Sequence, residues 1–513
     1  MGSDYVTDIG YLRSFHADLA PARLRLVAAL NGLTPPPAER FDYCELGCAY
    51  GDTTVTLAAA NPAARFVGID LNPEHVALGQ RTAEDGGVGN VRFLERDFGA
   101  LAAGDLGELD FIAAHGVMSW IGPEKRRALV ALAGARLKPG GLLYVSYNAM
   151  PGWAAVEPLR QLILSGAGTE GDSLERARKG VAFAKQMRDA GAEYFTENPP
   201  AREMLESMEK VGLRYVVHEY LHAHWAPMYF ANVAWDMAAA DLHFVGSLPL
   251  HSNYRDLTIP APLAAVFEGV SDRVTFESLK DFALNAYFRR DVYVKGKPVR
   301  SAAATATYLD ATSFVTTQTA LPVERDVAVP HHVLRCTGAI FDALLAALAE
   351  GSATGAHLAR RPELASFGAE QVRAALLRLL LADHVAPVHG VTLAVATTAD
   401  EPHTVPSAFN RMILQRRLSS EIPIVLASPV AGTGVPLTAL EAVAIRLVTE
   451  VPPAERRAWV RAHFGREELR MTIRDRAIES EEEQSAVVFE GLARFERERL
   501  GKLVELGLLE PGA

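Results

Sequence analysis

Between about residues 20 and 150, the spacing of apolar positions switches repeatedly between that of a helix and that of a buried strand. Apolar residues that recur every three or four positions predict helices over residues 22–33, 53–60, 76–85 and 124–137. Short apolar runs between these segments predict strands at residues 41–46, 65–69, 91–94, 110–114 and 142–147. Strands that alternate with helices indicate a parallel sheet with helices on both faces.

This alternation stops after Trp153. Charge-rich segments with helical spacing follow at residues 175–190 and 201–211. We therefore expect residues 155–211 to form a helical insertion that covers the cleft of the sheet as a lid.

Extended spacing returns at residues 213–220 and 242–248, which predicts two late strands of the same sheet. The expected fold class is α/β, with a Rossmann-like seven-stranded sheet. Residues 1–154 and 212–255 are expected to form this core.

The C-terminal half divides into three expected regions, the first of which is a middle or linker region at residues 256–330. Its second part, residues 296–330, is rich in Ala, Thr and Ser and has no clear period. Residues 331–400 are typical of a winged-helix domain, because three helical segments precede a short apolar stretch; these lie at 338–350, 358–364, 370–383 and 385–395. Residues 401–513 are expected to be mainly helical, at 438–461 and 479–508.

Composition narrows the class of protein. The 513 residues suffice for about two to four domains, and 49% of them are hydrophobic, as in a globular protein. The formal net charge of −11 argues against a nucleic-acid partner, because nucleic-acid-binding proteins normally carry a basic stripe. The three cysteines, Cys44, Cys48 and Cys336, provide no disulfide framework. We find neither a basic-then-apolar leader nor an apolar run of spanning length, and expect a cytoplasmic protein without membrane contact.

The most informative motif is the turn Glu45-Leu-Gly-Cys-Ala-Tyr-Gly51, between the first strand and the next helix. Glycines in such a turn let backbone N–H groups and the helix N-terminus approach a ligand closely. Asp70 ends the second strand, 19 residues after Gly51. The same spacing fits the ribose-binding acid of a dinucleotide fold, so the turn alone leaves the cofactor open.

Three further features distinguish a dinucleotide from a cationic cofactor. Glu45 would repel a pyrophosphate, whereas it suits a cofactor that carries a sulfonium and an ammonium. Asp97, within Glu95-Arg-Asp-Phe98 after the third strand, is placed to accept a hydrogen bond from an adenine amino group. Lys138-Pro-Gly-Gly141 turns the chain into the fifth strand.

In this order, the features resemble the class I S-adenosylmethionine-dependent methyltransferases. The resemblance implies S-adenosyl-L-methionine as cofactor and S-adenosyl-L-homocysteine as product. It implies that Glu45, Gly47 and Gly51 line the methionine end and that Asp70 binds the ribose. The remaining cofactor-binding residues that it implies are Leu71, Asp97, Phe98 and His115. One position departs from the family, because Ala49 stands where a second glycine is usual.

A narrower resemblance begins at Val145-Ser-Tyr-Asn-Ala-Met-Pro-Gly-Trp153. This segment is similar to bacterial methyltransferases with a methyltransferase regulatory domain, which include the rickettsial-type protein lysine methyltransferases of outer-membrane proteins. Further similar segments lie at residues 218–221, 227–230, 288–294 and 427–431. The resemblance implies C-terminal domains that select a polypeptide substrate.

Candidate catalytic residues follow the fourth and fifth strands, because ligands of open α/β sheets bind at the carboxyl ends of the strands. His115, Tyr147 and Asn148 are the catalytic candidates. His115 acts as a base or orients the acceptor, or it only packs or caps, and Asn148 alternatively only forms a turn. Trp120 contacts substrate or packs beneath the cleft. An amine acceptor must also lose a proton, and a free lysine has a pKa of about 10.4.

Other candidates for the substrate side lie outside the core motifs. Tyr5 and Tyr11, in a segment that also holds His16, form a lid over the cofactor or a floppy terminus. His218-Glu-Tyr-Leu-His222 matches the zinc pattern HExxH, which requires a helix. Because the preceding residues favour a strand, we expect no metal. Instead, Glu219, His222 and His224 line the substrate side of the cleft, or they end an exposed strand.

A charged cluster in an aromatic setting comprises Arg289, Arg290 and Asp291. A structural salt bridge between domains is its favoured role, and binding an acidic part of a substrate is the alternative.

Three functions remain open on the sequence. The favoured one is methylation of a protein or peptide side chain, with a lysine amine as acceptor. The second is N-, O- or C-methylation of a peptide or small-molecule natural product. The third is a non-catalytic, cofactor-binding regulator that recruits a partner or DNA; against DNA, residues 370–383 hold only two basic residues, Arg373 and Arg378. A homodimer is compatible with each.

Overall fold

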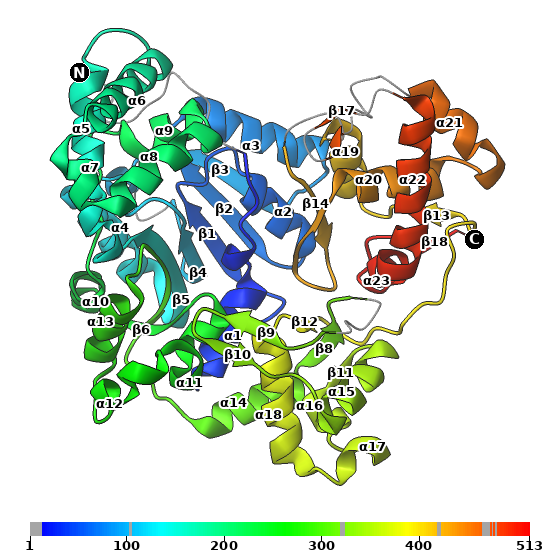
Figure 1. Ribbon diagram of the computed structural model, residues 1–513. Coiled ribbons are helices and arrows are strands. Elements are labelled where there is room, and N and C mark those ends of the chain that lie inside the picture. Colours follow the sequence, from blue (N-terminus) through cyan, green and yellow to red (C-terminus); the bar gives the residue numbers. More distant parts are fainter. Residues whose placement is uncertain are drawn as a thin grey trace.

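The computed structural model describes residues 13–101, 105–318, 324–417, 422–463, 472–473, 476–477 and 480–512. Its N-terminal half is built on a seven-stranded sheet with the strand order β3-β2-β1-β4-β5-β7-β6 (Figure 1). The strands are β1 Asp42–Leu46, β2 Arg65–Asp70, β3 Val91–Glu95, β4 Leu109–Ala114, β5 Leu137–Asn148, β6 Leu242–Ser247 and β7 Phe288–Lys295. The first five run parallel, and β7 lies antiparallel between β5 and β6. The Rossmann-like seven-stranded fold is thus confirmed.

Helices cover both faces of this sheet, as the alternation predicts. One face packs against α1 Pro21–Leu30, α2 Asp52–Ala60 and α3 Pro73–Asp85. The other packs against α4 Pro123–Arg136 and α10 Phe230–Ala239. The parallel order places the carboxyl ends of β1, β2 and β4 at one edge, which is where the candidate site lies.

The prediction of a strand at residues 213–220 is wrong, because Leu213–Tyr220 forms helix α9. The apolar residues Leu213, Val216, Val217 and Tyr220 have the i, i+3, i+4, i+7 spacing of a helix. They face the other helices of the insertion rather than the sheet. The seventh strand is instead β7, which lies between β5 and β6. The sheet therefore extends beyond residue 255, the expected end of the core.

The helices of the insertion lie together at one side of the sheet (Figure 1), and they have a small core of their own. Buried residues from Trp153 to Leu221 form this core and include Leu159, Ile163 and Phe195. The helices that contribute to it are α5 Glu157–Ala167, α6 Ser173–Asp189, α7 Glu193–Glu197, α8 Pro199–Val211 and α9.

Residues 296–330, expected as a linker or connecting subdomain, contain a helix and two strands within their described part. Helix α14, Ala302–Ala311, packs on α1, with the Thr305 hydroxyl donating to Ala29 O at 2.7 Å. The strands are β8 Ser313–Thr316 and β9 Val327–Val329, the latter paired with β10 His332–Leu334. Before β7, the middle region holds α11 Arg255–Thr258, α12 Ala264–Phe267 and α13 Arg273–Leu284.

The region expected to be winged-helix-like has the expected helices but a different strand arrangement. Its helices are α15 Ala339–Ala349, α16 Gly355–Leu358, α17 Pro362–Ala365 and α18 Gly368–Leu381. Strand β12, Val385–Val388, pairs with β8 from before the helices, and β11, Ala353–Thr354, pairs with the other edge of β8. A winged-helix identity therefore stays a prediction.

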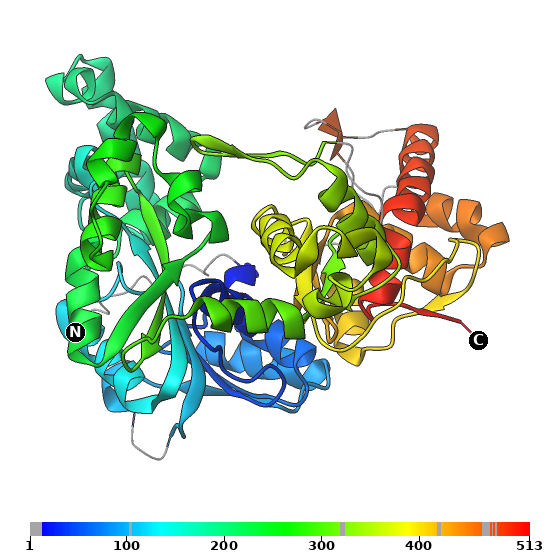
Figure 2. The same cartoon turned by 90° about the horizontal axis from the view of Figure 1, so that it is seen from below.

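The C-terminal region returns to the core of the molecule (Figures 1 and 2). Its hairpin, β14 Ile424–Ser428 with β15 Thr433–Leu437, packs against α2. In both views the remaining C-terminal helices lie across the sheet from the insertion. They are α19 Ala408–Arg417, α20 Ala439–Glu450, α21 Arg456–His463, α22 Glu481–Phe495 and α23 Gly501–Glu505. Short strands pair as β13 His403–Thr404 with β18 Glu510–Pro511, and β16 Thr472–Ile473 with β17 Arg476–Ala477. Within the described ranges, no helix is both long and apolar enough to cross a membrane.

Candidate active site

The turn after β1 has a backbone shape that depends on its glycines. Gly47 and Gly51 have φ values of 74° and 73°, in the left-handed region. A Cβ on either would lie 2.6 Å from a neighbouring side chain, Val117 or Phe93 respectively. Ala49 has a φ of 46°, a conformation that costs a non-glycine residue about 1–2 kcal/mol. The family's second glycine would avoid this cost.

Asp70 fastens the turn to the end of β2. Its carboxylate accepts hydrogen bonds from Ala49 N at 2.8 Å and from Asn72 N at 2.9 Å, and it lies 3.2 Å from His75 Nδ1. The bond to Ala49 N holds this residue in its unfavourable conformation. Leu71, the next residue, is 40% exposed.

Glu45 is a buried acid at the base of the turn. The Thr54 hydroxyl donates to its carboxylate at 2.5 Å. Burial raises the pKa of Glu45 to about 8, against the effect of the Thr54 hydrogen bond, and the charges of Asp70 and Asp52 raise it further. A cation beside Glu45 would favour its ionised form, so the residue fits a cationic ligand.

Asp97 lies after β3 and caps a short helical turn, Phe98–Ala100. Its carboxylate accepts from Gly99 N at 2.9 Å and pairs with Lys125 Nζ at 2.9 Å. Burial acts to raise the pKa of Asp97, but the hydrogen bonds from Lys125 and Gly99 and the charge of Lys125 lower it overall. Phe98 is half-buried against the core.

His115 directly follows β4. Its side chain lies on the face of the sheet to which Tyr144 and Ser146 of β5 point. Its Nδ1 lies 2.9 Å from the Tyr144 hydroxyl and 3.2 Å from Ser146 Oγ. The ring of His16 packs against it at a tilt of 32°, with the centroids 3.9 Å apart. Burial lowers the pKa of His115 to about 3, helped by the positive fields of His16 and Arg290. A neutral imidazole this weakly basic suits an orienting role better than that of a base.

Asn148 and Glu219, which the sequence suggested separately, meet at the end of β5. The Asn148 side-chain amide donates to a Glu219 carboxylate oxygen at 2.9 Å. The Asn148 backbone is fixed as well, since its N–H donates to Ser119 Oγ and its carbonyl accepts from Met228 N, both at 2.8 Å. Burial raises the pKa of Glu219 to about 7, although the hydrogen bond from Asn148 acts in the opposite direction.

Tyr147 does not join this group. Neighbouring residues of a strand point to opposite faces, so Tyr144, Ser146 and Asn148 share the site face while Tyr147 lies beneath it. Tyr147 is fully buried, and its hydroxyl donates to Asp291 Oδ2 at 2.7 Å. The structure therefore contradicts a catalytic role for Tyr147 in contact with substrate.

The buried network around Tyr147 is centred on Arg289. This guanidinium pairs with Asp291 at 2.9 Å, Asp281 at 2.5 Å and Glu277 at 3.0 Å, and so joins β7 to α13. Arg290 instead pairs with Asp18 at 2.5 Å. The charged cluster is thus engaged in salt bridges, but those of Arg289 lie within the expected middle region rather than between domains.

We expected no metal at His218–His222 because this segment was predicted to be a strand. That premise is wrong, since His218 and Glu219 lie on helix α9. The ring centroids of His218 and His222 are 6.3 Å apart, and Glu219 is engaged by Asn148. The described residues contain no group of three His, Cys, Asp or Glu residues arranged to hold a metal ion. Burial, followed by the charges of His218 and Arg160, lowers the pKa of His222 to about 4.

The remaining substrate candidates are dispersed. Trp120 is half-buried, and its Nε1 has no hydrogen-bond partner among the described residues. His224 is exposed and lies beside Gly122. Tyr5 and Tyr11 lie outside the described residues.

The sequence interpretation missed two residues of the site face, Tyr144 and Ser146. Their alternation with Asn148 along a predicted strand was the available signal. It also missed Phe288, which is paired with Asn148 across the β5–β7 ladder. Phe288 is 43% exposed and lies edge-on to His115, with 6.2 Å between ring centroids. No local pattern could have revealed this contact, since β7 was not predicted.

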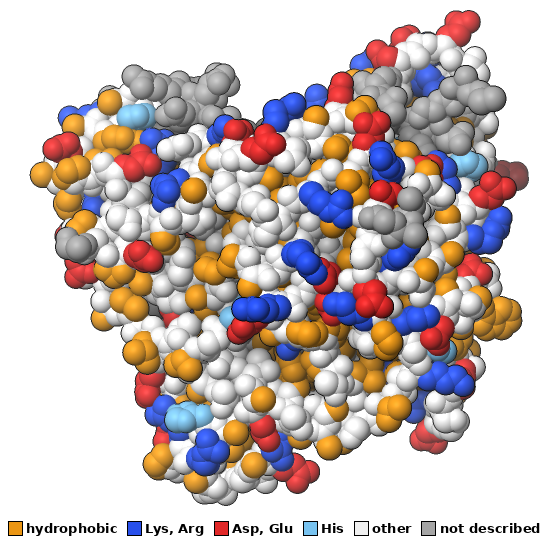
Figure 3. Space-filling model, turned by 180° about the vertical axis from the view of Figure 1, so that it is seen from behind, with side chains coloured by type: hydrophobic (Ala, Val, Ile, Leu, Met, Phe, Trp, Pro, Cys, Tyr) orange, Lys and Arg blue, Asp and Glu red, His pale blue; other side chains and the backbone are white. Residues whose placement is uncertain are grey.

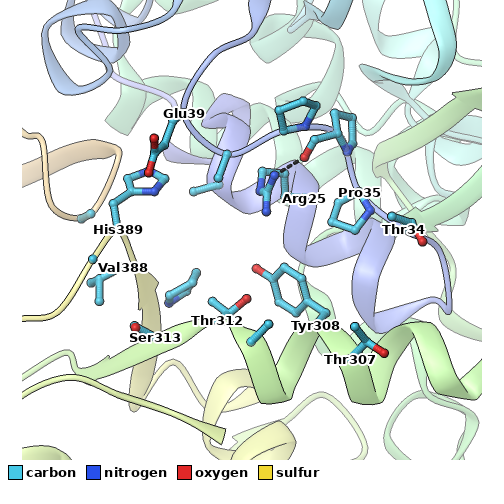
Figure 4. A pocket seen from close by; sticks show the side chains of 18 of the residues that line it. Arg25, Thr34, Pro35, Glu39, Thr307, Tyr308, Thr312, Ser313, Val388 and His389 are labelled. Carbon is cyan, nitrogen blue, oxygen red and sulfur yellow. Dashed lines mark hydrogen bonds between the residues drawn. The ribbon is translucent and has the colours of Figure 1, made fainter. Parts of the chain in front are cut away.

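A cavity of about 680 Å³ lies away from these residues (Figure 4). It is lined by α1, by the loop that precedes β1, by α14 and by the chain after β12, and the labelled side chains include Arg25, Tyr308 and His389. None of the candidate site residues lines it. On the face in Figure 3, acidic and basic side chains are interspersed and form no single basic stripe.

The sheet order, the glycine turn, and the acids Glu45 near the end of β1, Asp70 at the end of β2 and Asp97 after β3 define a class I methyltransferase core. A family model described as a methyltransferase domain matches residues 44–141, and one described as a predicted methyltransferase regulatory domain matches residues 213–295. The chain therefore carries an S-adenosyl-L-methionine-dependent methyltransferase domain of class I and a methyltransferase regulatory domain.

Similarity to known proteins extends over almost the whole chain. An uncharacterized protein of Synechocystis sp. is 29% identical over 507 residues, 98% of this chain and 99% of that protein. An uncharacterized protein of Rickettsia prowazekii is 26% identical over 273 residues, 52% of this chain and 48% of that protein. The solved structure of PKMT2 from Rickettsia typhi in complex with AdoHcy superimposes with a TM-score of 0.72 at 18% identity, over 95% of this chain and 99% of that one. The fold of 95% of this chain is thus shared with PKMT2.

Proposed function

We propose that this methyltransferase methylates the side-chain amine of a lysine in a protein or peptide. The observation that carries the proposal is the hydrogen-bonded pair Asn148–Glu219 at the end of β5, on the face of the sheet that also carries His115. The fold shared with PKMT2 and the resemblance to the rickettsial-type lysine methyltransferases support a polypeptide acceptor.

The cofactor is proposed to lie along the turn after β1. Glu45 fits its cationic end, because the buried carboxyl has no cationic partner among the described residues. The Asp70 carboxylate accepts two backbone hydrogen bonds and contacts His75, so about one of its four lone-pair directions remains for a ribose hydroxyl. The other proposed contacts are Gly47, Gly51, Leu71, Asp97, Phe98 and His115. S-adenosyl-L-methionine supplies an electrophilic methyl group on a sulfonium.

Glu219 is proposed as the base that makes a lysine amine nucleophilic. An ammonium group cannot attack, so its proton must leave first. With a pKa of about 7, Glu219 is largely ionised at pH 8 and takes up a proton near neutral pH. Asn148 holds one of its carboxylate oxygens in place, and the buried surroundings lower the pKa of an incoming amine. The proton passes from the ammonium nitrogen to Glu219 and then to water.

Phe288 is proposed to contact the substrate beside this pair. Phe288 lies opposite Asn148 and next to His115, and its ring is exposed, so it is accessible to a substrate. An aromatic face suits both the aliphatic stem and the cationic head of a lysine.

The contact between Asn148 and Glu219 also supports a proposal for how the chain is divided into a lid and a core. Residues 155–211, with α9, form a lid that brings Glu219 to the end of β5. The methyltransferase core then extends to the end of β7 at Lys295.

The test is kinetic and uses Glu219→Gln on the full-length protein, with a lysine-containing polypeptide acceptor identified by methyl labelling. Loss of the base is expected to lower kcat about 10²–10⁴-fold and to abolish the rise of kcat through pH 7, while cofactor affinity stays within about twofold. Glu203→Gln, an exposed acid on the insertion, is the matched control and should behave as wild type. An unchanged kcat in Glu219→Gln would contradict the proposed base.

A further inference from the structure

Asp52 connects three distant parts of the chain. It is the first residue of α2, directly after the glycine turn, and is 6% exposed. Arg13 donates to its two carboxylate oxygens from Nε at 2.8 Å and from Nη2 at 2.6 Å. Arg417, the last residue of α19, donates to Asp52 Oδ1 as well. One buried carboxylate thus holds Arg13, near the N-terminus, and Arg417, from the C-terminal region.

The segment that Arg13 begins lies across the candidate active site. The backbone N–H of His16 donates to Thr53 Oγ1 at 3.1 Å, and the His16 ring packs against that of His115. Asp18 ends the segment in its ion pair with Arg290. Residues 13–18, here called the cover segment, are therefore fixed at both ends, and their middle rests on His115.

The C-terminal region contacts the cover segment at a second point. A Cβ on Gly434, in β15, would lie 2.7 Å from the Phe15 ring and 2.9 Å from the Thr56 methyl group. Only a residue without a side chain fits between the cover segment and α2 here. The C-terminal hairpin therefore packs against both elements.

Arg417 is fixed by contacts within the C-terminal region, so its side chain moves together with that region. Its Nη1 donates to Pro423 O at 3.1 Å, and its side chain is only 7% exposed. Burial lowers the pKa of Arg417, and the charge of Arg13 adds to this, whereas Asp52 opposes both. Both arginines donate to the same oxygen, Asp52 Oδ1, so their two pairs with Asp52 are mutually dependent.

We propose that Arg417 is a positioning residue for cofactor binding: through Asp52, the C-terminal region holds the cover segment over the glycine turn and His115. The inference rests on the cofactor site proposed above. A partner that moved α19 would then loosen the cover over the cofactor. The C-terminal region thereby gains a role in the core reaction that neither domain match describes.

Calorimetric titration of the full-length protein with S-adenosyl-L-methionine tests this proposal. Arg417→Ala is expected to raise the Kd about tenfold, with kcat at saturating cofactor within about twofold of wild type. Arg417→Lys, which keeps the charge, should fall between the two. Arg416→Ala is the matched control, because Arg416 lies on the same helix in a half-exposed pair with Asp85. It should bind as wild type does.

A double-variant cycle separates positioning from general destabilisation. If Arg417 acts through Arg13 and the cover segment, Arg13→Ala combined with Arg417→Ala should bind no more weakly than the weaker single variant. Additive losses, or an unchanged Kd in Arg417→Ala, would overturn the proposal. Should Arg417→Ala not fold, Arg417→Lys enters the same cycle in its place. Failure of the wild type to bind the cofactor would instead remove the proposed site itself, and the positioning role with it.

Discussion

At the scale of single residues, the site contains two acids whose ionisation is displaced in the same direction. Burial raises the pKa of Glu45 to about 8 and that of Glu219 to about 7. Glu45 lies at the base of the glycine turn, whereas Glu219 lies on α9 beside the end of β5. The titration of each acid should therefore affect a different step of the reaction. Cofactor binding should follow Glu45, and acceptor activation should follow Glu219.

Cofactor affinity is expected to depend on pH through Glu45. Below pH 8 its carboxyl is mostly protonated in the free protein, and a cationic ligand beside it favours the ionised form, so binding releases a proton. The Kd should therefore fall by up to about tenfold per pH unit as the pH rises toward 8, and then level off. Titration calorimetry from about pH 6 to pH 9 measures this.

Glu45→Gln provides the comparison, because Thr54 can still donate to the amide oxygen. The variant should lose this pH dependence and keep the weak affinity seen at low pH. Any titration of the cofactor's own amine would be common to both proteins and cancel between them. Identical pH profiles for variant and wild type would show that Glu45 does not contact the cationic end.

At the scale of elements, the sequence predicted local patterns well and long-range pairings poorly. The glycine turn and Asp70 were readable because strand, turn and helix follow one another directly. Strand β7 was not predicted, since Arg289, Arg290 and Asp291 resemble a surface segment until their partners on α13 are known. Helix α9 was mistaken for a strand because Val216 and Val217 are β-branched, although its spacing is helical. The pair Asn148–Glu219, 71 residues apart, depends on that helix.

The Arg289 network is expected to hold β7 in the sheet. Arg289→Met would leave Glu277, Asp281 and Asp291 close together without their shared cation. Removing one partner from such a buried group typically costs about 3–5 kcal/mol of unfolding free energy. Urea denaturation measures the loss. The control is Arg65→Met, whose pair with Asp42 is exposed and should contribute about 0–1 kcal/mol. Equal losses in both variants would contradict the structural role of the network.

At the scale of the whole molecule, the proposed active site is assembled from three regions. The core supplies the glycine turn and Asn148, the lid supplies Glu219, and the C-terminal region fixes the cover segment through Arg417. Arg417 and Asp52 are 365 residues apart, so nothing in the local sequence of either indicates their contact. In the proposed arrangement, the large C-terminal half closes one side of the site of the methyltransferase core.

The most direct test of the central claim is to locate the transferred methyl group. The full-length protein is incubated with isotopically labelled S-adenosyl-L-methionine and proteins of its host, and peptide mass spectrometry then identifies the labelled atoms. The account predicts label on lysine side-chain nitrogens of a polypeptide, present with wild type and absent with Glu219→Gln and with Asp70→Ala. Label confined to small molecules would contradict it.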